Sequence, residues 1–182
     1  MSNTMIQLAI DSDKLNSFCD QLIRRSRDRE KTHDSLVTLE AFITRFCQDS
    51  QGSSEFQQAI AVIRRHSDKT REQLLSEKAE RLITALRSLD KAAITDIYLP
   101  LSRNGFQEIL QSIVPRFSEL ELSIIAQWSH EWLSYSKHKA ETASEYPDAP
   151  DFRKAGISME EYRAMEDVDR FLYRHVSQQT AA

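Results

Sequence analysis

The chain has 182 residues, with 24 Lys or Arg against 28 Asp or Glu and a formal net charge of −4. This length suits one domain, or one domain with a helical extension, and it can bury a core without disulfides or metal ions. The acidic balance gives the whole chain no attraction for nucleic acid or anionic membranes. The sequence contains no run of 18 apolar residues, the length that a helix needs to span a bilayer.

Glycine and proline are scarce, with three and four copies respectively. Hairpin-rich β folds and doubly wound α/β folds need glycine at their turns, so both are disfavoured. Leu, Ala, Glu, Gln and Arg are plentiful, and these residues favour helices. We therefore predict an all-α fold: a helical bundle of five to seven helices, with a long antiparallel helical hairpin in the N-terminal half.

The first residues, MSNTMIQLAIDSDK, have no basic start and only a short apolar run, unlike a signal peptide. Ile6, Leu8 and Ile10 alternate as in a strand, but a lone strand leaves its backbone groups unpaired. We therefore expect this segment to be loose or helical. Asp11 or Ser12 then caps the first helix.

Residues 12–47 show helical periodicity at both ends, separated by the charged run RRSRDREK at 24–31. The apolar positions are Leu15, Phe18, Cys19, Leu22 and Ile23 before that run, and Leu36, Leu39, Phe42, Ile43 and Phe46 after it. Because neither Gly nor Pro interrupts the segment, one long helix is favoured over two helices broken near Thr32–Asp34. The sequence DSQGSS at 49–54 is the first clear loop.

The two cysteines, Cys19 and Cys47, lie among apolar residues of helical pattern. Cytosolic disulfides are rare, so we expect two buried thiols in a reducing compartment rather than a bridge between them. The predicted location of the protein is cytoplasmic.

Residues 53–99 contain no Gly or Pro and form the longest helical pattern of the chain. Steps of four and three residues define two neighbouring seams: Phe56, Ile60, Ile63, Ser67, Thr70 and Leu74, then Leu75, Ala79, Leu82, Leu86, Leu89 and Ala93. This period is typical of coiled-coil packing between helices. A polar middle at 66–72 allows a break there, and Pro100 ends the pattern. Together with 12–47, this stretch predicts the hairpin of an N-terminal part, 1–101.

Residues 102–182 are predicted to form a compact helical part that continues the same domain. Three box-like cap pairs begin helices here: Asn104 with Gln107, Ser118 with Glu121, and Ser158 with Glu161. The first of these helices stops at Pro115, and the second runs to Ala143. The third carries the apolar stripe Tyr162, Met165, Val168, Leu172 and Val176.

The motifs of common catalytic and cofactor sites are missing from the sequence. The three glycines are too far apart for a phosphate loop or a dinucleotide fingerprint. His130-Glu131 resembles the start of a zinc-protease helix, but the second histidine would fall at Ser134. We therefore predict no catalytic residues, no metal site and no cofactor, and we expect that the protein is not an enzyme.

Two basic clusters follow apolar helical segments. The first includes Arg24, Arg25 and Arg27, and the second includes Arg64, Arg65, Lys69 and Arg71. Acidic residues are interleaved with both, which favours a solvated face with ion pairs one turn apart. The alternatives are contact with nucleic-acid phosphates and docking of an acidic partner.

An aromatic face is predicted on the helix after Ser118. Trp128 and Trp132 are one turn apart, with Tyr135 close by. A buried core role is favoured, and the alternative is an interface anchor, because Trp and Tyr are enriched at binding hot spots. Tyr162, on the last helix, is the fourth candidate partner-binding residue.

These observations predict a non-catalytic helical accessory or adaptor subunit that mediates protein–protein interaction in a larger cytoplasmic complex. The partner is another protein or a second copy of the chain, with no membrane contact. The first alternative is an accessory protein that contacts nucleic-acid phosphates through the two basic clusters, and the second is a small helical enzyme.

Overall fold

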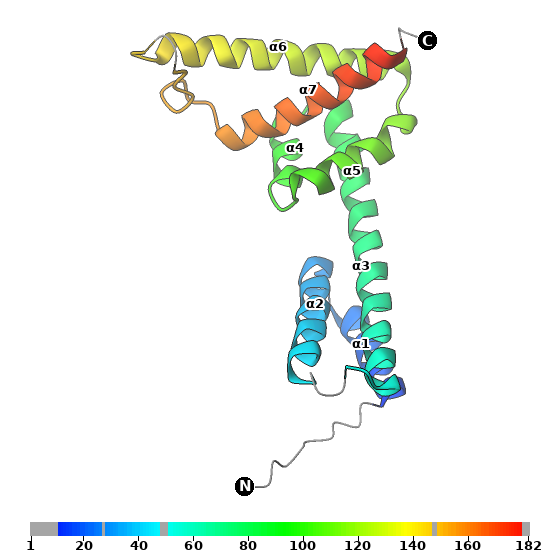
Figure 1. The fold of residues 1–182 in the computed structure, drawn as a ribbon. Coiled ribbons are helices and arrows are strands. Elements are labelled where there is room, and N and C mark those ends of the chain that lie inside the picture. Colours follow the sequence, from blue (N-terminus) through cyan, green and yellow to red (C-terminus); the bar gives the residue numbers. More distant parts are fainter. Residues whose placement is uncertain (1–10, 27, 48–50, 147–148, 180–182) are drawn as a thin grey trace. The chain divides into compact units, whose positions relative to one another are not determined.

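The computed structural model describes residues 11–26, 28–47, 51–146 and 149–179, the last six of these by their backbone only. Within these ranges it contains seven α-helices, one 3-10 helix and no strand (Figure 1). The predicted all-α fold with five to seven helices is confirmed. The strand-like alternation at 6–10 lies outside the described residues.

The chain divides into two compact units, residues 1–76 and residues 77–182. The division falls inside helix α3 (Ser54–Arg87), whereas the sequence-based division was placed at residue 101. Residues 1–76 hold eleven basic and eleven acidic side chains, so this N-terminal unit has no formal net charge. The C-terminal unit carries the whole net charge of −4.

The N-terminal unit begins with two helices, α1 (Ser12–Arg25) and α2 (Arg29–Phe46). The prediction of one long helix was therefore wrong, and so was the alternative break near 32–34, because α1 ends at Arg25 and α2 begins at Arg29. Ser26 has extended backbone, and the Asp28 carboxylate accepts a hydrogen bond from the Lys31 N–H at 3.1 Å. The charged run thus supplies the cap that begins a new helix.

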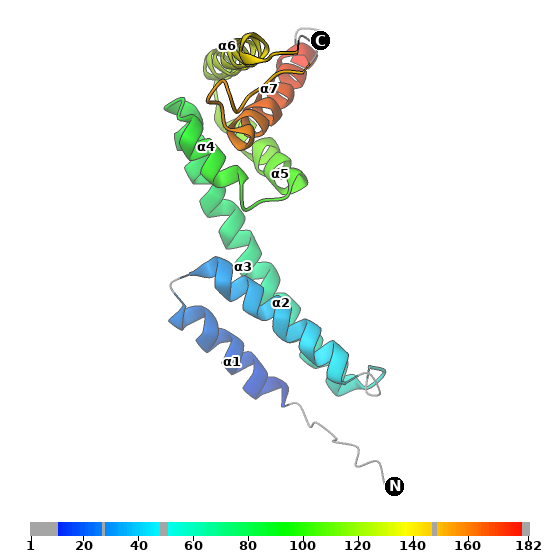
Figure 2. The ribbon, with the colours of Figure 1, turned by 90° about the vertical axis from the view of Figure 1, so that its left-hand side faces the viewer.

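The first part of α3 completes this unit by running antiparallel to α2, so α1 and α3 point in the same direction (Figure 2). Cys19, Leu36 and Ile63, one from each helix, are fully buried against one another. Leu15, Leu22, Leu39 and Ile43 pack around them. The predicted seam is buried as well, at Phe56, Ile60, Ile63, Ser67 and Thr70. Cys47, in contrast, is only half-buried.

The C-terminal unit contains the end of α3. This helix ends at Arg87, whereas the sequence predicted that the helical pattern continues to Pro100. The N–H of Asp90 donates to the Ala85 carbonyl at 2.9 Å, and the N–H of Leu89 donates to the Leu86 carbonyl. Leu89 adopts a left-handed φ of 53°, a position that glycine usually takes in this Schellman-type ending. Asp90 then caps α4 (Lys91–Tyr98).

Two further elements precede the longest helix of this unit: α5 (Arg103–Ile113) and the 3-10 helix η2 (Val114–Arg116). The cap of α5 is Ser102, whose hydroxyl accepts from the Gly105 N–H, and not the predicted Asn104. Pro115 lies inside η2, where the missing N–H costs no helical hydrogen bond.

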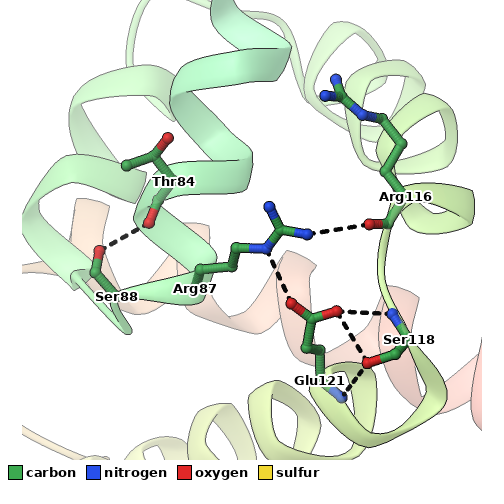
Figure 3. Close-up of polar contacts among 6 residues, drawn as sticks. All are labelled: Thr84, Arg87, Ser88, Arg116, Ser118 and Glu121. Carbon is green, nitrogen blue, oxygen red and sulfur yellow. Dashed lines mark hydrogen bonds and ion pairs between the residues drawn. The ribbon is translucent and has the colours of Figure 1, made fainter.

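Helices α6 (Glu119–Ala143) and α7 (Met159–Gln179) form an antiparallel pair. The predicted capping box of Ser118 and Glu121 is present at the start of α6. Glu121 also accepts a hydrogen bond from Arg87 Nε at 2.9 Å, which ties the end of α3 to this cap (Figure 3). The core of the unit includes Leu82, Leu86, Phe106, Leu110, Leu122, Ile125, Met165, Val168 and Leu172.

Candidate interaction surface

Two of the four predicted partner-binding residues lie together in an aromatic cluster of the C-terminal unit. The ring centroid of Tyr162 is 6.3 Å from that of Trp132 and 4.5 Å from that of Phe152. Lys91 Nζ lies 4.9 Å from the Trp132 ring centroid and 3.2 Å from Glu161 Oε1. Trp132 and Tyr162 are both half-buried, so the cluster is a packed junction of α4, α6, α7 and the loop before α7.

The other two predicted residues are placed differently. Trp128 is half-buried on α6. Tyr135 is 61% exposed and shares the outer side of α6 with the exposed residues Leu120 and Ile124. The outer side of α6 is therefore the part of the predicted aromatic region that another molecule could reach. Tyr146, in the loop before α7, is also largely exposed.

The basic residues of α3 are engaged inside the N-terminal unit. Arg64 Nε donates to Glu40 Oε1 at 2.8 Å, and Arg65 Nη2 donates to Asn16 Oδ1 at 2.6 Å. Both contacts join α3 to another helix, whereas the sequence predicted ion pairs one turn apart along the same helix. Lys69 and Arg71 are exposed.

The basic residues of α1 lie in its last turn, where Arg24 and Arg25 are exposed. Arg27 lies outside the described residues. Because α1 and α3 run in the same direction, Arg24 and Arg71 both lie beyond the Asn16–Arg65 contact, toward the same end of the unit (Figure 2).

An accessible apolar surface lies in a groove between α1 and α2, here called the α1–α2 groove. Its hollow has a volume of about 700 Å³. Phe18 and Leu22 line it from α1, and Lys31, Asp34, Ser35, Thr38, Leu39 and Phe42 line it from α2. The lining is polar near the α1–α2 turn and apolar toward the far end of α2.

Large apolar side chains are unusually exposed along this groove. Phe18 is 52% exposed, Phe42 is 56% exposed, and Phe46 is 66% exposed one turn beyond Phe42. The rings of Phe42 and Phe46 pack together with centroids 4.3 Å apart. Single exposed apolar residues are ordinary, but a contiguous group of them beside a hollow marks an interaction surface.

Sequence reasoning did not identify this groove. Phe18, Phe42 and Phe46 follow the same helical period as the buried residues of α1 and α2, so the sequence pattern does not separate them from the core. The periodicity gives the width of the apolar stripe but not the number of helices available to cover it. The sequence signal that could have indicated the groove is the wide apolar stripe on α2, from Leu36 to Phe46.

The polar side of the same unit contains two histidines. His66 is buried, with Nε2 2.9 Å from Asn16 Oδ1 and Nδ1 3.7 Å from Asp20 Oδ1. Burial lowers the pKa of His66, and the nearby Asp20 carboxylate partly opposes this effect. His33 Nδ1 lies 3.2 Å from the buried Ser67 hydroxyl. These contacts hold α1 and α2 against α3.

The described residues contain no group of three or more His, Cys, Asp or Glu side chains placed to hold a metal ion. Ser129 donates to Asp169 at 3.3 Å, and His130 Nδ1 lies 3.8 Å from the same carboxylate oxygen. Ser129 is fully buried and bonded to the acid rather than to the histidine, so this arrangement differs from a nucleophile activated by a base. None of the helices in the described ranges combines the length and apolar character that crossing a bilayer requires.

No protein-family model, curated protein or solved structure matches this chain.

Proposed function

We propose that the protein is a non-catalytic helical accessory subunit that mediates protein–protein interaction in a larger cytoplasmic complex. The observation that carries this proposal is the α1–α2 groove, which Phe18 and Phe42 line, with Phe46 one turn beyond Phe42; all three are more than half exposed. Aromatic anchors beside a pocket are the usual centre of a protein interface. The exposed outer side of α6, with Leu120, Ile124 and Tyr135, offers a second apolar surface on the other unit.

The proposal is tested by purifying the tagged full chain from its native cells and identifying what co-elutes. Phe42→Glu places a charge in the groove and is expected to remove at least one specific protein from the eluate. Val37→Glu is the matched control, because Val37 is 48% exposed on the same helix but does not line the groove. A set of co-eluting proteins that is identical for the wild type and both variants would contradict the proposal.

A second candidate function, contact with nucleic-acid phosphates, is supported by the exposed basic residues Arg24, Arg25, Lys69 and Arg71 of the N-terminal unit. Phosphate contacts release counterions, so binding should weaken steeply as salt rises. Replacing Arg24 and Arg25 by Ala should reduce this salt slope, whereas Arg45→Ala, at the far end of α2, should not. If labelled DNA and RNA fail to bind at roughly 50 mM salt, where screening is weak, this alternative is excluded.

A further inference from the structure

We infer that the α1–α2 groove binds the same groove of a second copy of this chain, so that the protein is a dimer through its N-terminal unit. This inference rests on the proposed function, because it names the partner of the surface that carries that proposal.

The shape of the surface suits pairing with itself. A two-fold interface joins one patch to an identical patch, so the patch must contain both a hollow and a projection that fills it. The groove supplies a hollow of about 700 Å³, and Phe46, 66% exposed, projects from the same side of α2. The aromatic contact with Phe42 holds the Phe46 ring in this position.

The positions along α2 define a register for such a dimer. Leu39, Phe42 and Phe46 follow one another at spacings of three and four residues, so they share one side of the helix. When two α2 helices lie antiparallel with Phe42 opposite its own copy, Phe46 falls opposite Thr38. Thr38 lines the hollow, so each Phe46 enters the groove of the other copy.

The charges of the unit permit this pairing. Two copies carry the same net charge, so a unit with a large net charge of one sign would repel its own copy. The N-terminal unit holds eleven basic and eleven acidic side chains and has no formal net charge. The groove itself is lined by one cation, Lys31, and one anion, Asp34. The lining of the groove therefore offers no attraction to a strongly acidic or strongly basic partner.

The experiment is sedimentation equilibrium of the full chain over a concentration series. The wild type is expected to reach twice the monomer mass of 21.1 kDa. Phe42→Glu and Phe46→Glu are each expected to raise the dimer dissociation constant about 30-fold or more, as loss of a hot-spot side chain does. Val37→Glu, the matched control, should leave the dimer dissociation constant within about threefold of the wild-type value. Circular dichroism must show that each variant retains the helix content of the wild type.

A charge pair tests the register. Adding Thr38→Arg to Phe46→Glu in one chain places opposite charges across the interface, because residue 46 of each copy faces residue 38 of the other. The double variant should regain part of the affinity that Phe46→Glu alone loses. An absence of recovery would overturn the antiparallel register.

The outcomes separate this inference from the proposed function. A wild type that stays monomeric at every concentration overturns the dimer, as does a Phe42→Glu variant that dimerises as well as Val37→Glu. If the wild type is monomeric but Phe42→Glu loses a different co-eluting protein that Val37→Glu keeps, the adaptor function stands and only self-association falls. If neither self-association nor co-elution depends on Phe42, both proposals fall.

Discussion

His66 and Asn16 are joined by a hydrogen bond of 2.9 Å between Nε2 and Oδ1, which connects α3 to α1 inside the N-terminal unit. Arg65 donates to the same oxygen, so the Asn16 atom is the carbonyl acceptor and His66 Nε2 carries the hydrogen. The neutral ring therefore leaves Nδ1 without a proton, facing Asp20 at 3.7 Å. Protonation of His66 would place a cation in a buried position beside Arg65.

The N-terminal unit should therefore lose stability as the pH falls. Burial lowers the pKa of His66 below its ordinary value of 6.5, so the unfolded chain binds the proton more readily than the folded chain. The stability that the neutral His66 contributes is complete above pH 6.5, and it is lost as the pH falls through the lower pKa that His66 has in the folded chain. Thermal unfolding between pH 7.5 and 5 should show this loss in the wild type. His66→Gln should flatten the dependence, whereas His130→Gln, at a largely exposed position, should retain it.

Arg103 and Asp167 form an ion pair between α5 and α7 in the C-terminal unit. Arg103 Nε and Nη2 donate to Asp167 Oδ1 at 2.9 and 2.6 Å, and the carboxylate side chain is only 3% exposed. Arg103→Met should lower the unfolding free energy by about 1–3 kcal/mol, because it leaves a buried carboxylate without the cation that it pairs with. The double variant with Asp167→Leu should be more stable than Arg103→Met alone. Chemical denaturation of the two variants checks this order, and a double variant that is less stable would contradict it.

The two thiols should react at very different rates. Cys19 is fully buried, and burial raises the pKa of its thiol, so little of the reactive thiolate forms. Cys47 is half-buried at the end of α2. Titration of the native chain with Ellman's reagent should show one fast thiol, with the second appearing only on unfolding. Cys47→Ser should remove the fast phase, and a remaining fast phase in that variant would contradict the assignment.

Parts of the fold that depend on local sequence signals could be predicted. The capping box of Ser118 and Glu121 began α6 as expected, because the two residues satisfy each other's backbone groups within one turn. The break at 26–28 was missed, because Asp28 is one acid among several in a charged run and nothing in its spacing marks it as a cap. The break after Arg87 was missed for a different reason: Leu89 takes the left-handed conformation where glycine would have marked the helix end.

The candidate site was harder to predict than the fold, because burial depends on tertiary neighbours. Phe42 and Leu36 belong to the same apolar pattern of α2, yet Leu36 is fully buried and Phe42 is more than half exposed. The difference arises because, among the residues of the N-terminal unit that the structure describes, α1 and α3 are the only helices besides α2 itself, and they leave this side of α2 uncovered. Two of the residues predicted to bind a partner, Trp132 and Tyr162, lie side by side in the structure, together with Phe152 and Lys91.

The roles of Trp132 and Tyr135 can be separated by their alanine variants. Trp132→Ala removes the ring that Lys91 and Tyr162 contact, so it should lower the unfolding free energy by about 2 kcal/mol. This is less than the ~3–5 kcal/mol expected for a fully buried tryptophan, because Trp132 is only half-buried. Tyr135→Ala, at a position 61% exposed, should stay within about 0.5 kcal/mol of the wild type.

Chemical denaturation followed by circular dichroism measures both changes, and co-elution measures binding. If Trp132 stabilises the fold and Tyr135 binds a partner, the two variants should give opposite results. Trp132→Ala should lose stability, while Tyr135→Ala should keep its stability and lose a partner. If Trp132→Ala unfolds at the wild-type denaturant concentration, the junction of α4, α6 and α7 does not depend on this ring. Its half-exposed face would then be available to a partner, as the sequence-based alternative of an interface anchor supposed.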